Sequence, residues 1–215
     1  GLEIGGAVIA SRGKAQEIQR IIGGRSTQDI WCIPGGVAKG LQPDELEQIK
    51  PMAADLYDFT QFSLQLFRDV VLANPTYLEI IANGPYTLDV HNMGLVDENN
   101  AVDFYDGQVR VVDFEGAEIC RYEPREYADY VAEHVEPWSY LKFPYLKRRG
   151  WKGFVEGIDT PIYCATPLSR LNVADRMATP KAQEGFEEMF TTLGGHPSRM
   201  LLAQHWARLV EMVQN

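Results

Sequence analysis

Apolar residues recur with a helical period through the first part of the chain. In residues 7–22 they return at the spacing of one helical face, and Gly23 and Gly24 then supply a stop. Residues 44–73 keep the same period for about eight turns, with Pro51 as the position where a long helix would kink. The pattern therefore predicts two long helices.

The stretch "YLEIIA" predicts one more short helix, after Pro75 has ended the long one. Between the two long helices, Pro34, Gly35 and Gly36 forbid regular continuation and indicate an ordered loop. We therefore expect residues 1–93 to be helical, with loops as the only interruptions.

The period changes in the middle of the chain. Residues 101–122 alternate between apolar and polar side chains, and Asp106-Gly107 and Glu115-Gly116 are turn dipeptides. This pattern predicts a small β-meander of three short antiparallel strands.

The last part of the chain returns to helical patterning. Residues 124–134 place Tyr127, Tyr130 and Val131 on one side of a helix, and two further helices are expected to begin at Pro180 and Pro197. Residues 123–215 are therefore expected to be mainly helical. The fold class that follows is α+β and helix-dominated: a long-helix bundle with a small antiparallel β-meander, in a single portion that covers residues 1–215.

Composition and charge narrow the possible partners. The chain is 45% hydrophobic, carries a net charge of −10 and has a sequence pI of about 4.9, with its acidic residues scattered. Such a chain lacks the basic footprint of a nucleic-acid binder. No apolar run reaches the length of a membrane span and no signal peptide is visible, so we expect a cytoplasmic protein that binds neither nucleic acid nor membrane.

The residues that could hold a metal are dispersed. The three cysteines, Cys32, Cys120 and Cys164, form no CxxC pair and make a disulfide framework improbable. The four histidines have no metal-ligand spacing and are expected to be structural or exposed. No Gly-rich nucleotide loop and no nucleophile elbow is present either.

Lys142 is the most distinctive single residue, because it lies in the aromatic and proline-rich stretch "EPWSYLKFPYLKRRGW". A lysine buried there would need an acidic partner, and Glu133 is the candidate. Such a pair could orient water or a metal ligand. The alternative is that Lys142 extends past the rings into solvent.

Several stretches resemble the large subunit of nickel-iron hydrogenases, in the cytosolic bidirectional and cofactor-reducing group. They occur in that family's order, over nearly the whole chain: "IIGGRSTQDIWCIPGGVAKGL", "HNMGLVDENNAVDFYDGQVRVVD", "YVAEHVEPWSYLKFPYLKRRGW", "PLSRLNVADRMATPKAQEGFEEM" and "HWARLVEM". The resemblance implies an oxidoreductase that oxidises H2 reversibly, coupled to a soluble electron carrier. It also implies a nickel-iron centre with CO and cyanide on iron, a magnesium ion, and a partner in the form of an iron-sulfur small subunit.

Both CxxC motifs that hold the nickel-iron centre in the family are absent from this sequence. The chain therefore looks like the middle of a large subunit, with no cofactor of its own and no activity alone. A stand-alone, non-catalytic scaffold or docking protein of the same descent is the alternative. A fragment with unpartnered helices is also expected to self-associate.

The resemblance also assigns roles to individual residues. Glu133 and Lys142 would lie near the magnesium ion and bond to it through water, without being direct ligands. His-Pro of the family's PGG segment is Gln28-Asp29 here, which puts contact with the partner's cluster in doubt. The remaining positions that match family motifs are Gly24, Arg25, Pro34, Gly35, Gly36, Arg170 and Asn172. A hydrolase that uses Glu133 and His134 has only their adjacency in its favour.

Overall fold

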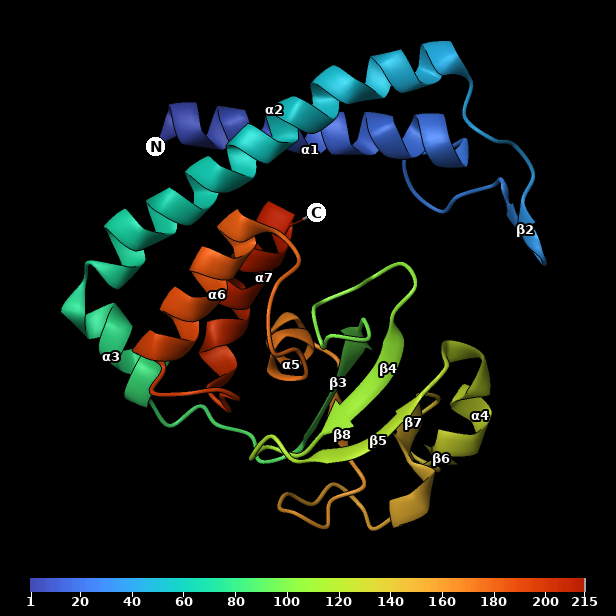
Figure 1. Cartoon of the computed structure of the whole chain (residues 1–215), viewed down its shortest axis with the longest axis vertical. Helices are drawn as coiled ribbons and strands as arrows, with labels where there is room; N and C mark the ends of the chain where they lie inside the picture. Colours follow the sequence, from blue (N-terminus) through green and yellow to red (C-terminus); the bar gives the residue numbers. More distant parts are fainter. Residues whose placement is uncertain (215) are drawn as a thin grey trace. The chain divides into compact units, whose positions relative to one another are not determined.

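The computed structural model describes residues 1–214 and divides the chain into two compact units, Gly1–Gln65 and a second that starts at Leu66. The protein is an α+β fold that is about half helical, with small sheets (Figure 1). Each unit is built differently. None of the helices in residues 1–214 combines the length and the apolar composition needed to cross a membrane.

The first unit is a pair of long helices that lie side by side, α1 (Leu2–Gly23) and α2 (Pro43–Phe67) (Figure 1). Lys14 on α1 and Asp55 on α2 form an ion pair at 2.5 Å. Gly24 ends α1 in the left-handed conformation, with φ at 81°, as the two glycines predicted. The loop between the helices holds a two-residue hairpin of β1 (Cys32–Ile33) and β2 (Gly36–Val37).

The predicted helix 44–73 is confirmed with a change at its end. α2 continues past Phe67 as a π-helical turn, η1 (Arg68–Leu72). The short helix predicted from "YLEIIA" is α3 (Pro75–Asn83). Pro75 is its first residue, because the Asn74 side chain accepts hydrogen bonds from the Thr76 and Tyr77 amides and caps the helix.

The second unit is built on a four-stranded sheet in the order β5-β4-β3-β8. β3 pairs antiparallel with β4, β4 pairs antiparallel with β5, and β8 is parallel to β3. Figure 1 shows α5 between this sheet and the helices α6 and α7. The bounds are β3 (His91–Val96), β4 (Gln108–Val112), β5 (Glu118–Tyr122), β8 (Tyr163–Cys164), α5 (Pro167–Asn172), α6 (Pro180–Thr192) and α7 (Gln204–Gln214).

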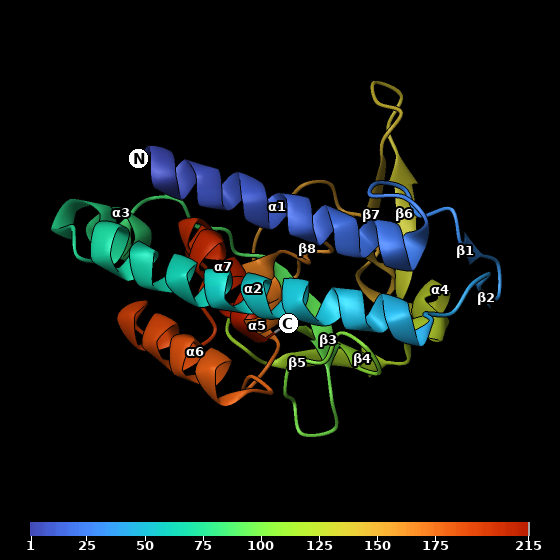
Figure 2. The same cartoon turned by 90° about the horizontal axis from the view of Figure 1, so that it is seen from above.

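A second, two-stranded sheet follows β5. It consists of β6 (Val131–Val135) and β7 (Lys142–Leu146), which Figure 2 shows extending away from the four-stranded sheet. Short helical turns flank it: η2 (Pro124–Glu126), α4 (Tyr127–Tyr130) and η3 (Lys147–Arg149). Its base packs on the sheet, where the fully buried Leu146 joins Val111 and Tyr122 in an apolar cluster.

Four sequence predictions differ from this fold. The meander was predicted within residues 101–122, but its third strand is β3, which lies before residue 101 and begins at His91, inside the part expected to be helical. Residues 103–107 form a turn instead, because the Asp103 carboxylate accepts hydrogen bonds from the Tyr105 and Asp106 amides. The β1–β2 hairpin was likewise missed.

The predicted helix at 124–134 is also wrong beyond Tyr130. The β-branched Val131 and Val135 are the ends of β6, and pairing with β7 outweighs the short helical pattern before them. Pro197 does not begin a helix either. The segment after it is extended, with Met200 bridged to Thr87, and helical structure resumes at η4 (Leu201–Ala203).

The close approach of β3 to α5 generates a stability prediction. A Cβ added at Gly94 would lie 2.6 Å from Val173 Cγ2 and 2.9 Å from the Arg170 Cα. We expect Gly94→Ala to lower the free energy of unfolding by about 1–3 kcal/mol, because α5 must shift. Chemical denaturation measures this. Gly5→Ala is the control, because Gly5 lies within α1 with nothing within 4 Å of the added Cβ, and it should stabilise by roughly 0.5–1 kcal/mol.

Candidate functional site

The short helix α5 carries Arg170 and Asn172, two of the residues selected from the sequence. Thr166 caps the helix by accepting a hydrogen bond from the Ser169 amide, and Pro167 is its first residue. Leu168, Leu171 and Asn172 are buried. The helix is thus a core element whose polar side chains must be satisfied inside the protein.

Arg170 makes a two-pronged ion pair with Glu211 of α7. Its Nε donates to Glu211 Oε1 at 2.7 Å, and Nη2 donates to Oε2 at 2.8 Å. The Glu211 side chain is 0% exposed. A buried carboxylate is strongly unfavourable without such a partner, and a planar guanidinium matches it in geometry. A third bond, from Arg170 Nη1 to the Ala165 carbonyl, fixes the other edge of the guanidinium.

Asn172 fastens a distant segment to the sheet. Its Nδ2 donates to Asn92 Oδ1 of β3 at 3.1 Å and to the Ser198 carbonyl at 2.7 Å, and its Oδ1 accepts from the Ser198 amide at 3.0 Å. Asn92, Asn172 and Ser198 are all buried. One amide side chain therefore replaces the strand partner that the backbone of Ser198 lacks.

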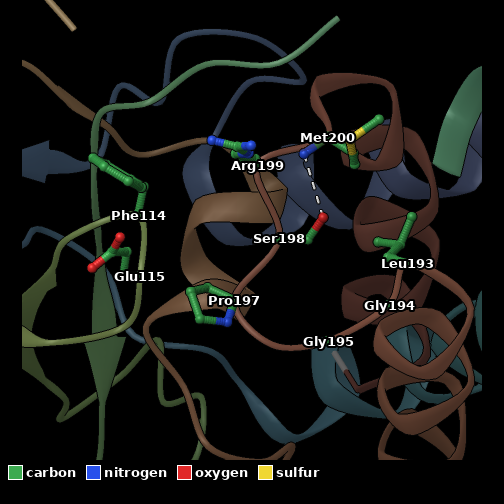
Figure 3. Close-up of a pocket in the computed structure, with 9 residues that line it drawn as sticks. All are labelled: Phe114, Glu115, Leu193, Gly194, Gly195, Pro197, Ser198, Arg199 and Met200. Atoms are coloured by element: carbon green, nitrogen blue, oxygen red, sulfur yellow. Dashed lines mark hydrogen bonds between the residues drawn. The ribbon is translucent and has the colours of Figure 1, made fainter. Parts of the chain in front are cut away.

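A cavity of about 370 Å³ lies beside this segment (Figure 3). Its walls are the β4–β5 turn on one side and the chain from α6 to η4 on the other. Ser198, held by Asn172, contributes its Oγ as acceptor for the Met200 amide. Arg199 is bound to Asp89 at 2.9 Å. The lining residues are Phe114, Glu115, Leu193, Gly194, Gly195, Pro197, Ser198, Arg199 and Met200.

A second ion-pair network joins the sheet to the end of α5. Arg110 on β4 donates to Glu118 at 2.8 Å, to Asp175 at 3.0 Å and to the Val173 carbonyl at 2.6 Å. Burial opposes ionisation of Glu118, but hydrogen bonds from Arg121 and Arg110 outweigh it and lower the pKa of this carboxyl. Sequence reasoning missed this network, since its members lie up to 65 residues apart.

Glu211 was also missed, although the sequence holds a signal for it. The buried residues of α7 are Trp206, Ala207, Val210, Glu211 and Val213, so the glutamate occupies an otherwise apolar stripe. A charged residue on such a stripe needs a buried partner.

Glu133 and Lys142 form the ion pair that the sequence suggested, at 2.9 Å between Lys142 Nζ and Glu133 Oε2. Both side chains are exposed, at 54% and 62%, and the hydrogen bond to Glu133 raises the pKa of Lys142. The rings do not enclose the lysine. Lys142 pairs with Val135 across the hairpin, so it lies on the face opposite to Phe143 and His134. The alternative of a solvent-exposed ammonium group is the one the structure shows.

Glu133 and His134 are consecutive residues of β6, and successive side chains of a strand point to opposite faces, so the two side chains point away from each other. His134 instead bonds to Glu136 at 2.9 Å and stacks on Trp151. The structure therefore does not bring together the pair that a hydrolase would use. Within residues 1–214, no three His, Cys, Asp or Glu side chains come together as a metal site.

The matched residues of the first unit build a compact loop after α1. A Cβ at Gly24 would lie 2.7 Å from Trp31 Cε2, so only glycine lets this indole pack against the helix end. Gly35, with φ at 93°, turns the chain between β1 and β2 after Pro34, and Gly36 starts β2. Arg25 is exposed. Gln28 has a φ of 57° and Asp29 contacts Gly23, so the two residues in place of His-Pro belong to the same turn.

No family model matches the chain. It is 39% identical over 213 residues to the iron-sulfur subunit of the F420-non-reducing hydrogenase of Archaeoglobus profundus, covering 99% of this chain and 44% of that protein. The NAD-reducing hydrogenase HoxS subunit beta of Cupriavidus necator is 30% identical, over 96% of this chain and 41% of its own length. A crystal structure of a NAD+-reducing NiFe-hydrogenase in the H2-reduced state superposes with a TM-score of 0.81 at 28% identity, covering 99% of this chain and 45% of that one.

The chain resembles hydrogenase subunits over nearly its whole length. It spans less than half the length of the relatives it matches. The large-subunit identification made from the sequence is corrected by these names, because the A. profundus relative is named an iron-sulfur subunit. The prediction of an iron-sulfur small subunit as the partner is wrong for the same reason, because the A. profundus relative that aligns with this chain is itself named an iron-sulfur subunit. The nickel-iron centre and magnesium ion implied for the parent are withdrawn on the same ground.

The Arg170–Glu211 pair generates the second prediction. Arg170→Met leaves a buried carboxylate short of its two-pronged partner, so we expect a loss of about 3 kcal/mol in the free energy of unfolding. Arg208 also reaches Glu211, at 3.2 Å, but its side chain is 59% exposed. Arg208→Met is thus the matched control and should cost less than about 1 kcal/mol. Equal losses in denaturant titrations would contradict the assigned role of Arg170.

His91 generates a prediction about pH. Its side chain is buried on β3, and burial, followed by repulsion from Arg149, lowers the pKa of His91 below 6.5. His91 therefore binds a proton more readily in the unfolded chain than in the folded chain. The free energy of unfolding should fall as pH drops below about 6.5, by up to about 1.4 kcal/mol per pH unit for this group.

Unfolding titrations at pH 7.5 and pH 5.5 measure the effect. His91→Gln should reduce the difference between the two values, whereas His205→Gln, at an exposed position, should leave it unchanged. A pH difference that is the same in all three proteins would rule out His91 as its source.

Proposed function

We propose that this chain is a segment of a hydrogenase subunit that assembles with other subunits into an oxidoreductase of reversible H2 oxidation. The observation that carries the proposal is the match over 99% of the chain, both in sequence to the A. profundus relative and in fold to the NAD+-reducing enzyme. The names of the relatives favour a soluble electron carrier other than F420, with NAD as one candidate. A cytoplasmic location stays a prediction.

Within such a subunit, we expect the described residues to have a structural role. Arg170, Asn172 and Arg110 each make internal hydrogen bonds that join the sheet, α5 and the segments after it. An iron-sulfur cluster, which the name of the A. profundus relative suggests, does not fit the donors present here, because the three cysteines are free and do not converge. No step of electron transfer is therefore assigned to these residues.

The proposal predicts H2-dependent activity in the natural complex. The full-length polypeptide is tagged, purified without oxygen from its source together with its partners, and supplied with H2 and oxidised viologen. We expect reduction of the dye under H2 and none under N2. A second assay with NAD in place of the dye tests the carrier.

Two outcomes would remove the proposal. An intact complex that neither reduces viologen with H2 nor evolves H2 from reduced viologen is not a hydrogenase. A natural polypeptide of about 24.2 kDa that purifies without partners would instead support the stand-alone scaffold.

A further inference from the structure

The chain has three cysteines in all, one fewer than the four thiolates of an ordinary iron-sulfur cluster. Iron-sulfur clusters of the [2Fe–2S] and [4Fe–4S] types take four protein ligands, normally cysteine thiolates, with histidine replacing two in one variant. All three cysteines are free thiols. A cluster held by this chain alone would need at least two of these cysteines, with further ligands, at one place.

Cys120 and Cys164 lie at opposite edges of the four-stranded sheet. Cys120 is on the outer strand β5 and Cys164 on the outer strand β8, with β4 and β3 between them. Three strand spacings separate the two backbones by about 14 Å.

The two side chains also point to opposite faces of the sheet. Cys120 pairs with Val111, which pairs with Met93. Cys164 pairs with Asn92, the neighbour of Met93 on the same strand. Adjacent residues of a strand face opposite ways, so the sheet stands between the two sulfur atoms. No side-chain rotation can bring them to one cluster.

The surroundings of each thiol are those of a packing residue. Cys120 belongs to the apolar cluster of Val111, Tyr122 and Leu146. Cys164 packs near Asn92 and Ser169 on the α5 side. Burial raises the pKa of both thiols, which favours the neutral form over the thiolate that binds metal. Cys32 belongs to the first unit and is exposed on β1.

The histidines offer no replacement. His91 is enclosed on β3, His134 is bonded to Glu136, and His196 Nε2 lies 3.0 Å from the Leu171 carbonyl. His205 is exposed on α7. None of them forms a group with two further ligands among residues 1–214.

We infer that none of the cysteines of this chain ligates an iron-sulfur cluster, and that any cluster of the assembled subunit is held by polypeptide outside the described residues. The inference rests on the proposed hydrogenase function for the presence of a cluster. It assigns Cys120 and Cys164 to packing and leaves Cys32 as a free surface thiol.

The test uses the full-length protein in its complex, with Cys32→Ser, Cys120→Ala and Cys164→Ala combined. Iron and acid-labile sulfide per polypeptide, and the low-temperature EPR spectrum of the reduced complex, should equal those of the wild type. Loss of one cluster's iron from a folded variant would overturn the inference. Val109→Ala is the matched control, because it also truncates a side chain packed against the apolar cluster and shows what destabilisation alone does to the iron content.

Alkylation of the wild-type complex keeps the inference testable if the triple variant fails to fold. Cys32 should react at once with a maleimide under native conditions, while Cys120 and Cys164 should react only on unfolding, with or without an iron chelator. A cysteine that becomes reactive when iron is chelated from the folded complex would be a ligand, and the inference would be wrong. H2-dependent dye reduction is measured in parallel. If the wild-type complex does not reduce the dye with H2, the proposed function is wrong. If the triple variant nevertheless keeps its iron, the inference that these cysteines are not cluster ligands still holds.

Discussion

The buried carboxylate of Glu211 is the constraint on which the second unit depends. It lies on the apolar stripe of α7, and the two-pronged contact with Arg170, together with the more exposed Arg208 at 3.2 Å, compensates for removing it from water. That contact fixes α7 to α5. α5 in turn lies so close to β3 that a side chain at position 94 would clash with it, so a glycine is needed there. Asn172 extends the connection to Ser198.

The two faces of the four-stranded sheet are covered by different means. On the α5 face, ionic and amide groups fix the position of each element beside buried apolar side chains such as Leu171 and Val173. On the other face, the contacts are apolar and aromatic: Val111, Tyr122 and Leu146 form the cluster, and the Tyr122 and Tyr130 rings stack at 4.1 Å. Directional hydrogen bonds specify one arrangement, whereas apolar burial supplies most of the favourable free energy. The sheet needs both, since its strands are short.

The sequence predicted the elements whose apolar pattern repeats over many residues. It did not predict elements and contacts whose partners lie far apart in the chain. α1, α2 and α6 repeat an apolar stripe over many turns or begin at a proline, and these signals are local. The β6–β7 hairpin has a six-residue connection and follows a helical turn, so its strands are visible only once they pair. The same reason explains the site: Arg170 and Asn172 were singled out, but Glu211, Asn92 and Ser198 become partners only through the fold.

The way the polar groups are used argues for a structural role of this part of the protein. Arg170 uses its donors on Glu211 and Ala165, Asn172 uses both ends of its amide on Asn92 and Ser198, and Arg110 bonds to Glu118, Asp175 and Val173. Groups with satisfied hydrogen bonds rigidify a fold and have little capacity left for a substrate. The exposed Glu133–Lys142 pair neutralises itself on an open hairpin face. These polar groups therefore stabilise the fold of the second unit, and none of the hydrogen bonds named here leaves a group aimed at a ligand.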